Sequence, residues 1–166
     1  MRYRSYVAAL ALAALVSGAS AGQLPVAAVD FTPEVQDKLR LYGAQEAAVV
    51  QAAILESVSR AAARAALPDG LTVTITVRDL APTRPTRQLS ADDPALDVMH
   101  TRYLGGAALV GEVRDAQQRI VVTVRHRYFP PSIRQAALSP DPWADARLAI
   151  DQFATRLIKA CRKLAH

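Results

Sequence analysis

Arginine is the residue type in this chain whose spacing most directly suggests chemistry. Residues 104–129 hold two apolar runs with a period of two around a polar tetrapeptide at 115–118, the pattern of a β-hairpin. Residues 71–80 alternate in the same way. A guanidinium group presents planar donors that suit carboxylates and phosphates. We therefore expect one polar sheet face to be a candidate binding surface for an anionic partner, with solvated surface as the alternative; its arginines are Arg78, Arg114, Arg119, Arg125 and Arg127.

The connection at residues 81–103 is a second candidate binding region. It contains Arg84 and Arg87 together with three prolines and several acids. Long irregular connections inside a compact domain are uncommon and are often binding loops. The alternative is a simple crossover that lets the next strand reach its place. A helical turn is predicted near residues 93–96, and Arg84 and Arg87 join the candidate binding residues.

Catalytic chemistry has weak support in the sequence. Asp92, Asp93 and His100 share the 81–103 connection and could do acid/base work, but no spacing positions them. A G-x-S-x-G elbow, a phosphate-binding loop and a G-x-G-x-x-G motif are all missing from the sequence. The sequence therefore predicts no catalytic residue, with a small hydrolase using residues 81–103 kept as an alternative.

The histidines and the cysteine predict no metal site and no cofactor. The three histidines are far apart in sequence and have no metal-ligand spacing. Cys161 is the only cysteine, which excludes an intrachain disulfide, and we interpret it as a small apolar residue on a helix face. His126 falls on the apolar parity of its strand, so we expect it to be a hydrogen-bonded structural residue.

The N-terminus predicts export. Arg2 and Arg4 precede an apolar stretch that ends at Ala19-Ser20-Ala21, the arrangement of a cleavable signal peptide over residues 1–21. An uncleaved membrane anchor is the alternative, although the stretch is short for one. The remaining residues, 22–166, are predicted to form a single domain with no transmembrane span. Their net charge is +3, because the two signal arginines leave 18 basic against 15 acidic residues, which is too weak a charge to indicate nucleic acid.

The fold class follows from the order of the periodic segments. A short strand is expected at residues 26–31, then a helix from Pro33 to residue 67 that Gly43 can interrupt, a strand at 71–80, the hairpin, and a last helix that begins near Pro142. We predict an α+β fold, a three- to four-stranded and mainly antiparallel sheet with two helices packed on one face. In the hairpin, Arg114 should lie opposite Arg119 and Val113 opposite Ile120. Trp143 and Phe153 should be core residues of the last helix.

The second half of the chain resembles a known group of proteins. The likeness covers roughly residues 83–164 and rests on short motifs: Gly105-Gly106-Ala107, Glu112, Asp115, the run from Trp143 to Ala146, Phe153-Ala154 and Leu157. These resemble small exported bacterial proteins assigned to domains of unknown function, many of them envelope lipoproteins; the segment Arg84-Pro85-Thr86 is also similar to such proteins. The resemblance implies the envelope of a Gram-negative bacterium and supplies no catalytic residue. This chain departs from the lipoproteins because it lacks a lipid-accepting cysteine near its N-terminus.

Taken together, these patterns favour a periplasmic or secreted, non-enzymatic binding or accessory module of the cell envelope. The expected partner is an envelope protein or an anionic envelope polymer. A structural subunit of an envelope complex is the other non-enzymatic alternative.

Overall fold

The computed structural model describes residues 24–97 and 100–165; the predicted signal peptide lies outside these residues. The described chain forms four strands and four α-helices. In chain order these are β1 (Val26–Phe31), α1 (Pro33–Tyr42), α2 (Glu46–Ala62), β2 (Thr72–Ala81), α3 (Arg87–Asp92), β3 (Gly106–Arg114), β4 (Ile120–Tyr128) and α4 (Ala144–Arg162), with a final 3₁₀ turn at Lys163–Ala165.

The sheet order is β1-β2-β3-β4. β1 and β2 are parallel, and the other two neighbouring pairs are antiparallel. The parallel pair arises because α1 and α2 connect β1 to β2 as a crossover. The chain returns from β2 to the antiparallel β3 through the connection that holds α3, and a short turn joins β3 to β4. This confirms an α+β fold with a mainly antiparallel sheet.

The expectation of two helices is wrong: the described residues contain four. The first long helix breaks at Gly43, which adopts φ 131° and separates α1 from α2, a conformation that glycine reaches most easily. The connection before β3 holds α3, capped at its start by the Thr86 hydroxyl, which accepts from the Leu89 N–H. The turn predicted near residues 93–96 is present, closed by a hydrogen bond from the Leu96 N–H to the Asp93 carbonyl at 3.1 Å, and α3 precedes it.

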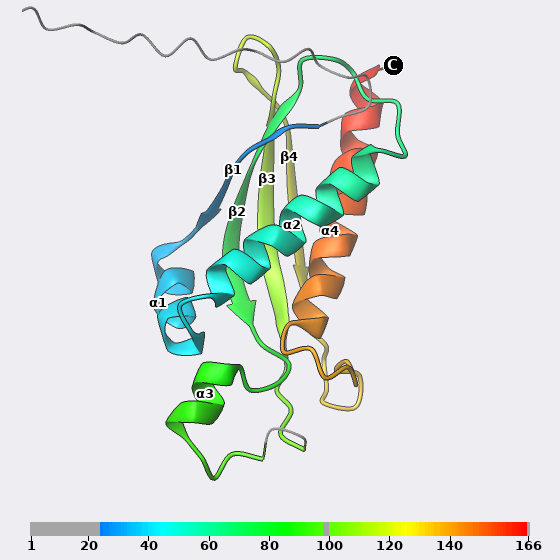
Figure 1. The fold of residues 1–166 in the computed structure, drawn as a ribbon. Helices are drawn as coiled ribbons and strands as arrows, with labels where there is room; N and C mark the ends of the chain where they lie inside the picture. Colours follow the sequence, from blue (N-terminus) through cyan, green and yellow to red (C-terminus); the bar gives the residue numbers. More distant parts are fainter. Residues whose placement is uncertain (1–23, 98–99, 166) are drawn as a thin grey trace, which may run out of the picture.

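The core lies between the sheet and the helices α2 and α4, which both cross the same face (Figure 1). α4 packs against β3, β4 and α2. The sheet face beneath the helices carries aliphatic side chains that are at most 1% exposed: Val73, Ile75, Val77, Leu109 and Val113. The opposite face of the sheet has no described helix over it, so the alternation in the sequence separates a covered face from an open one.

The hairpin register differs from the prediction by two residues up to Val113 and by one residue at Arg114, beyond the irregularity in the ladder. Val113 pairs with Val122 rather than Ile120, and Arg114 pairs with Ile120 rather than Arg119. The Asp115 N–H donates to the Arg119 carbonyl at 3.0 Å, which leaves three residues in the turn, with Gln118 at φ 63°. The ladder is irregular between Val113 and Arg114. Because a shift of two preserves the alternation, the arginines still lie on the open face, but Ile120 leaves the core and is 49% exposed.

Candidate functional site

Three of the five arginines predicted to share the open face of the sheet lie together. Arg78, Arg125 and Arg127 border a shallow hollow of about 580 Å³ whose floor includes Ala108 and Val110. The ladder between β2 and β3 is irregular at this point, since Val77 pairs with Leu109 while Asp79 pairs with Ala108. This bulge leaves Arg78 as the extra residue and places it beside the β4 arginines, because a bulge redirects the side chain that it contains.

The remaining predicted arginines of this sheet are engaged by acids near the hairpin turn. Arg114 lies 3.3 Å from Glu112, and its guanidinium also donates to the Gln118 carbonyl. Arg119 pairs with Asp115 at 2.7 Å. Backbone N–H donation from Arg119, with further bonds from its side chain, lowers the pKa of Asp115, so this carboxylate stays charged beside the arginine.

The positive charges around the hollow are less neutralised by acids than those near the hairpin turn. Arg127 lies 3.8 Å from Asp79 and stacks 4.4 Å from the centre of the Phe129 ring. Asp79 is also bound by Lys38 at 2.7 Å. Arg78 and Arg125 are both exposed, and neither forms a hydrogen bond or an ion pair with another described residue. Two guanidinium groups are therefore open to an external anion.

Arg84 and Arg87 lie away from the sheet strands. Arg84 donates to the backbone carbonyls of Leu138 and Ser139 at 3.3 and 2.7 Å, so it ties the segment before α3 to the loop before α4. Arg87 is exposed in the first turn of α3. The structure thus gives Arg84 a contact within the fold and leaves Arg87 on the surface.

Two residues of the motifs behind the resemblance, Gly105 and Asp145, meet in a buried polar cluster. Asp145, which is 1% exposed, accepts from the Thr83 hydroxyl at 2.9 Å and from the Ala137 N–H at 3.0 Å. Gly105 lies against the same threonine, because a Cβ at this glycine would come within 2.6 Å of the Thr83 nitrogen. Trp143 donates from its indole to Glu46 at 2.6 Å. These residues join the start of β3 to the start of α4, which is a structural role.

The acid/base candidates have separate partners. Asp92 accepts from Gln88, Asp93 from the Ala95 N–H, and Asp97 contacts His100. His126 lies on β4, where its Nε2 is 3.0 Å from Gln152 Oε1. The amide oxygen can only accept, so Nε2 carries the proton. Among residues 24–97 and 100–165, no hydrogen bond or ion pair joins the acids of the 81–103 connection to His126.

Two buried groups, His126 on β4 and Cys161 on α4, have pKa values that favour their neutral forms. Burial, helped by the charge of Arg156, lowers the pKa of His126, and the bond to Gln152 opposes this only in part. Burial raises the pKa of the Cys161 thiol to about 11. A neutral thiol is a poor nucleophile, so Cys161 acts as an apolar core side chain.

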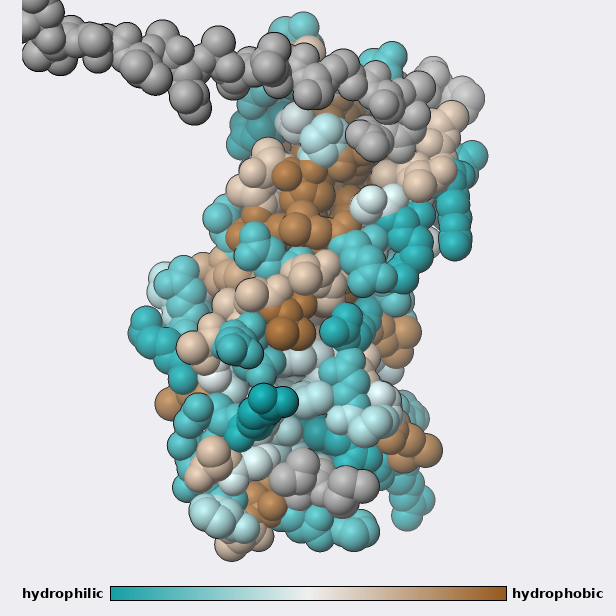
Figure 2. Space-filling model, in the orientation of Figure 1, coloured by the Kyte–Doolittle hydropathy of each residue, from teal (hydrophilic) through white to brown (hydrophobic). Residues whose placement is uncertain are grey.

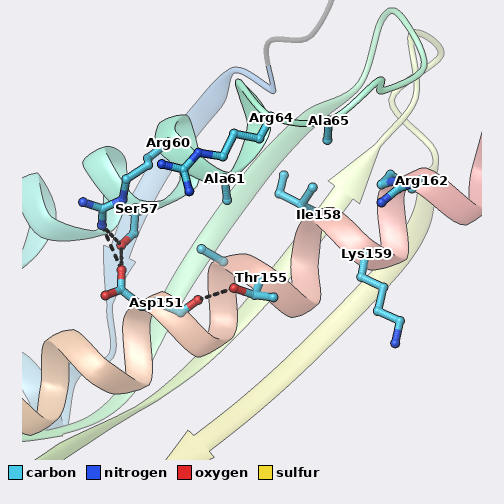
Figure 3. Close-up of a pocket in the computed structure, with 11 residues that line it drawn as sticks. Ser57, Arg60, Ala61, Arg64, Ala65, Asp151, Thr155, Ile158, Lys159 and Arg162 are labelled. Atoms are coloured by element: carbon cyan, nitrogen blue, oxygen red, sulfur yellow. Dashed lines mark hydrogen bonds and ion pairs between the residues drawn. The ribbon is translucent and has the colours of Figure 1, made fainter.

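A second basic surface, which the sequence analysis missed, lies between α2 and α4. It is a groove of about 570 Å³ with Ala61, Ala154 and Ile158 among its lining residues. Figure 3 shows α2 contributing one wall and α4 the other. The basic side chains along the groove are Arg60, Arg64, Lys159 and Arg162.

The groove was missed because its two walls are about 90 residues apart in sequence. The cations on α4 have a local explanation, since the helix dipole favours positive charge at a C-terminal end. The contact that joins the two walls could not be predicted from the sequence of one helix, because Ser57 and Arg60 on α2 both donate to Asp151 on α4. The spacing of Arg60 and Arg64, one helical turn apart, was the available signal.

Comparisons with known proteins were made on sequence and on structure. No family model matches the chain, and no curated protein matches it. Among solved structures, the chain is similar to the crystal structure of a minor lipoprotein from Acinetobacter baumannii, with a TM-score of 0.32 and 10% identity, over 83% of this chain and 92% of that chain. At that level of similarity the pairing supports no conclusion about fold or function.

No helix in the described part of the chain is long and apolar enough to cross a bilayer. Within the same residues, no group of three or more histidine, cysteine or acidic side chains could hold a metal ion.

Proposed function

We propose that the protein is an exported, non-enzymatic accessory module of the bacterial cell envelope, and that its open sheet face binds an acidic surface of another envelope protein. The observation that carries this proposal is the hollow bordered by Arg78, Arg125 and Arg127 on a sheet face with no described helix over it. The export pattern at residues 1–21 and the resemblance to exported envelope proteins supply the location.

The composition of the face favours a protein over a soluble anionic polymer. Between the arginines the surface holds small apolar and hydroxyl side chains, such as Ala108, Val110 and Thr76. A protein interface combines an apolar centre with arginine anchors, whereas a polyanion in water would use the charges alone. The strand backbone fixes the spacing of the arginines, so little order has to be created on binding.

Arg78 and Arg125 should provide most of the electrostatic attraction between this face and an acidic partner. Both are exposed and neither forms a salt bridge with a described acid, although a backbone hydrogen bond and, to a lesser extent, the charge of Arg78 lower the pKa of Glu34. Binding an external carboxylate therefore does not require an internal salt bridge to break. Exposed charges are screened over about 8 Å at physiological ionic strength. The interaction is therefore expected to weaken as salt is raised.

The test is crosslinking in intact envelopes followed by purification of the protein with its partner. The double variant Arg78→Ser/Arg125→Ser should fold normally, and partner capture should fall by at least about tenfold, since each charged contact in an interface contributes on the order of 1–3 kcal/mol. The matched control is Arg40→Ser/Arg134→Ser, which removes two arginines outside this face and should capture the partner like the parent.

Two results would contradict the proposal. Equal capture by the two double variants would show that the open face is only solvated surface. Capture of a glycan or another anionic polymer, rather than a protein, would assign the face to the other class of partner.

A further inference from the structure

The groove between α2 and α4 has a composition that suits a ligand with both a charged and an apolar part. We propose that it binds the phosphate-bearing headgroup of an anionic phospholipid and so docks this end of the domain on a bilayer surface. The proposal uses different residues from the open sheet face and does not depend on the function proposed above.

The basic wall of the groove has few acids to balance it. Arg64, Lys159 and Arg162 form no hydrogen bond or ion pair with another described residue. The one acid in the lining is Asp151, which already accepts from Ser57 and from Arg60. The helix dipole stabilises cations here, but it takes up none of their side-chain donors, which remain open to phosphate oxygens.

The floor of the groove gives the selectivity for a lipid. Ala61 and Ala65 are partly exposed between the two basic walls, and Ala154 and Ile158 lie beneath them at 1% and 6% exposure; Figure 3 shows Ile158 and Ala61 directed into the gap. A free phosphate would use the arginines and leave Ala61 and Ala65 in water. The glycerol and the first acyl carbons of a phospholipid would cover them, which adds a hydrophobic contribution to the electrostatic one.

Apolar surface continues around α2 at the same end of the molecule. A second hollow, on the other side of α2, includes Leu24, Val26 and Leu55, and Leu55 is 40% exposed. Figure 2 shows hydrophobic surface gathered in this upper part of the helix-covered face. Leu164, in the turn that follows Arg162, is also 40% exposed. Exposed aliphatic side chains beside unpaired cations are the pattern of a surface that lies on an anionic membrane.

The first experiment measures binding of the purified protein to vesicles. Vesicles of equal parts phosphatidylglycerol and phosphatidylcholine should sediment the protein, and pure phosphatidylcholine vesicles should not. Binding should weaken as salt is raised from low to physiological concentration. The variant Arg64→Ser/Arg162→Ser should lose about tenfold in apparent affinity, since each basic residue near an anionic surface contributes measurably.

The matched control is Arg78→Ser/Arg125→Ser, which removes the same charge from the open sheet face and should bind the vesicles like the parent. Equal losses of vesicle affinity in the two variants would mean that net charge alone attracts the protein, and would contradict the proposal that the groove is the binding site. Absence of sedimentation with phosphatidylglycerol would also overturn it.

A second experiment separates the possible ligands. Short-chain phosphatidylglycerol below its micelle concentration should shift the amide resonances of Ala61, Ala154 and Ile158 in nuclear magnetic resonance spectra, and inorganic phosphate at the same concentration should not. Equal shifts from inorganic phosphate would make the groove a simple anion site. Shifts from a synthetic acidic helical peptide, but none from the lipid, would assign the groove to a protein partner. Either result would overturn the proposal.

Discussion

The open sheet face and the α2–α4 groove are both rich in arginine, yet they balance their charge differently. On the sheet and its turn, Glu112, Asp79 and Asp115 each lie near one arginine, which leaves Arg78 and Arg125 without a salt bridge. In the groove, Asp151 is the one lining acid. The number of arginines in a segment therefore does not determine the net charge that a ligand contacts. That net charge depends on how many of the arginines form ion pairs with acids of the same chain. Exposed ion pairs of this kind contribute little to stability.

The same two regions also differ in what they contribute to stability. Substitutions on the open face change side chains that remain in water in the unpartnered protein. The helix layer, by contrast, buries the core-facing side chains of β2 and β3 and partly covers those of β1 and β4. Binding and stability should therefore separate: variants of the open face should alter partner capture, and variants beneath the helices should alter unfolding.

The largest effect is expected at Phe153, on the face of α4 that packs against the sheet. Its side chain is fully buried, and truncation to alanine should lower the free energy of unfolding by about 3–5 kcal/mol through lost burial and a cavity. Val110→Ala, on the open face, is the matched control and should cost much less. Urea unfolding followed by circular dichroism measures both, and similar losses would mean that the open face is covered in solution.

A smaller effect is expected at Gly111, where β3 passes beneath α4. A Cβ at this position would lie 2.8 Å from Cζ of Phe153, so Gly111→Ala should destabilise the protein by about 1–3 kcal/mol through overpacking. Phe153→Leu in the same chain removes the clashing atom and should make the glycine substitution less costly than it is alone. A double-mutant cycle of urea midpoints measures this coupling, and additive losses would show that the two side chains do not meet.

The sequence predicted features that depend on local periodicity. The alternation in β2, β3 and β4 placed the arginines on one face, and Gly43 marked the break between two helices. The hairpin register was wrong because loop length and bulges set the register and leave no mark in a two-residue period. Ile120 shows the consequence, since its apolar character suggested the core.

The candidate sites also differ in whether local sequence periodicity could predict them. The sheet arginines could be grouped because neighbouring strands display alternate residues, although the acids beside Arg114, Arg119 and Arg127 were not anticipated as partners. The groove could not be predicted, because it exists only where two helices distant in sequence cross. Gly105 and Asp145 likewise stood out as motif residues, and only the packing shows that both contact Thr83.

The stability of the core should also respond to pH through His126 on the covered face of β4, whereas the arginines of the open face should not titrate in this range. Burial lowers the pKa of His126, so the unfolded chain, with a histidine pKa of about 6.5, binds the proton more readily than the folded chain. Stability should be highest above that pH and should fall as the pH drops through the lower folded value. The urea midpoint should therefore decrease between pH 7.5 and pH 5.

Substitution of this histidine tests the assignment. His126→Gln should reduce the decrease, while His100→Gln, at an exposed position, should keep it. An unchanged pH dependence in the first variant would place the titrating group elsewhere.

The smallest effect concerns Cys161, which is buried on the core side of α4 next to Arg162 on the wall of the groove. Burial raises the pKa of its thiol to about 11, and the thiolate is the reactive form, so an aromatic disulfide reagent at pH 8 should modify the native protein only as fast as the core opens. If the two helices stay packed, this rate should match global unfolding and should be the same in Arg64→Ser/Arg162→Ser, whose changes are on the exposed rim. A faster reaction, with unfolding unchanged, would mean that α4 separates from α2 while the sheet remains folded. The groove would then be an opening between moving helices, whereas the strands hold the arginines of the open face at a fixed spacing. The two basic surfaces would then differ in rigidity as well as in charge.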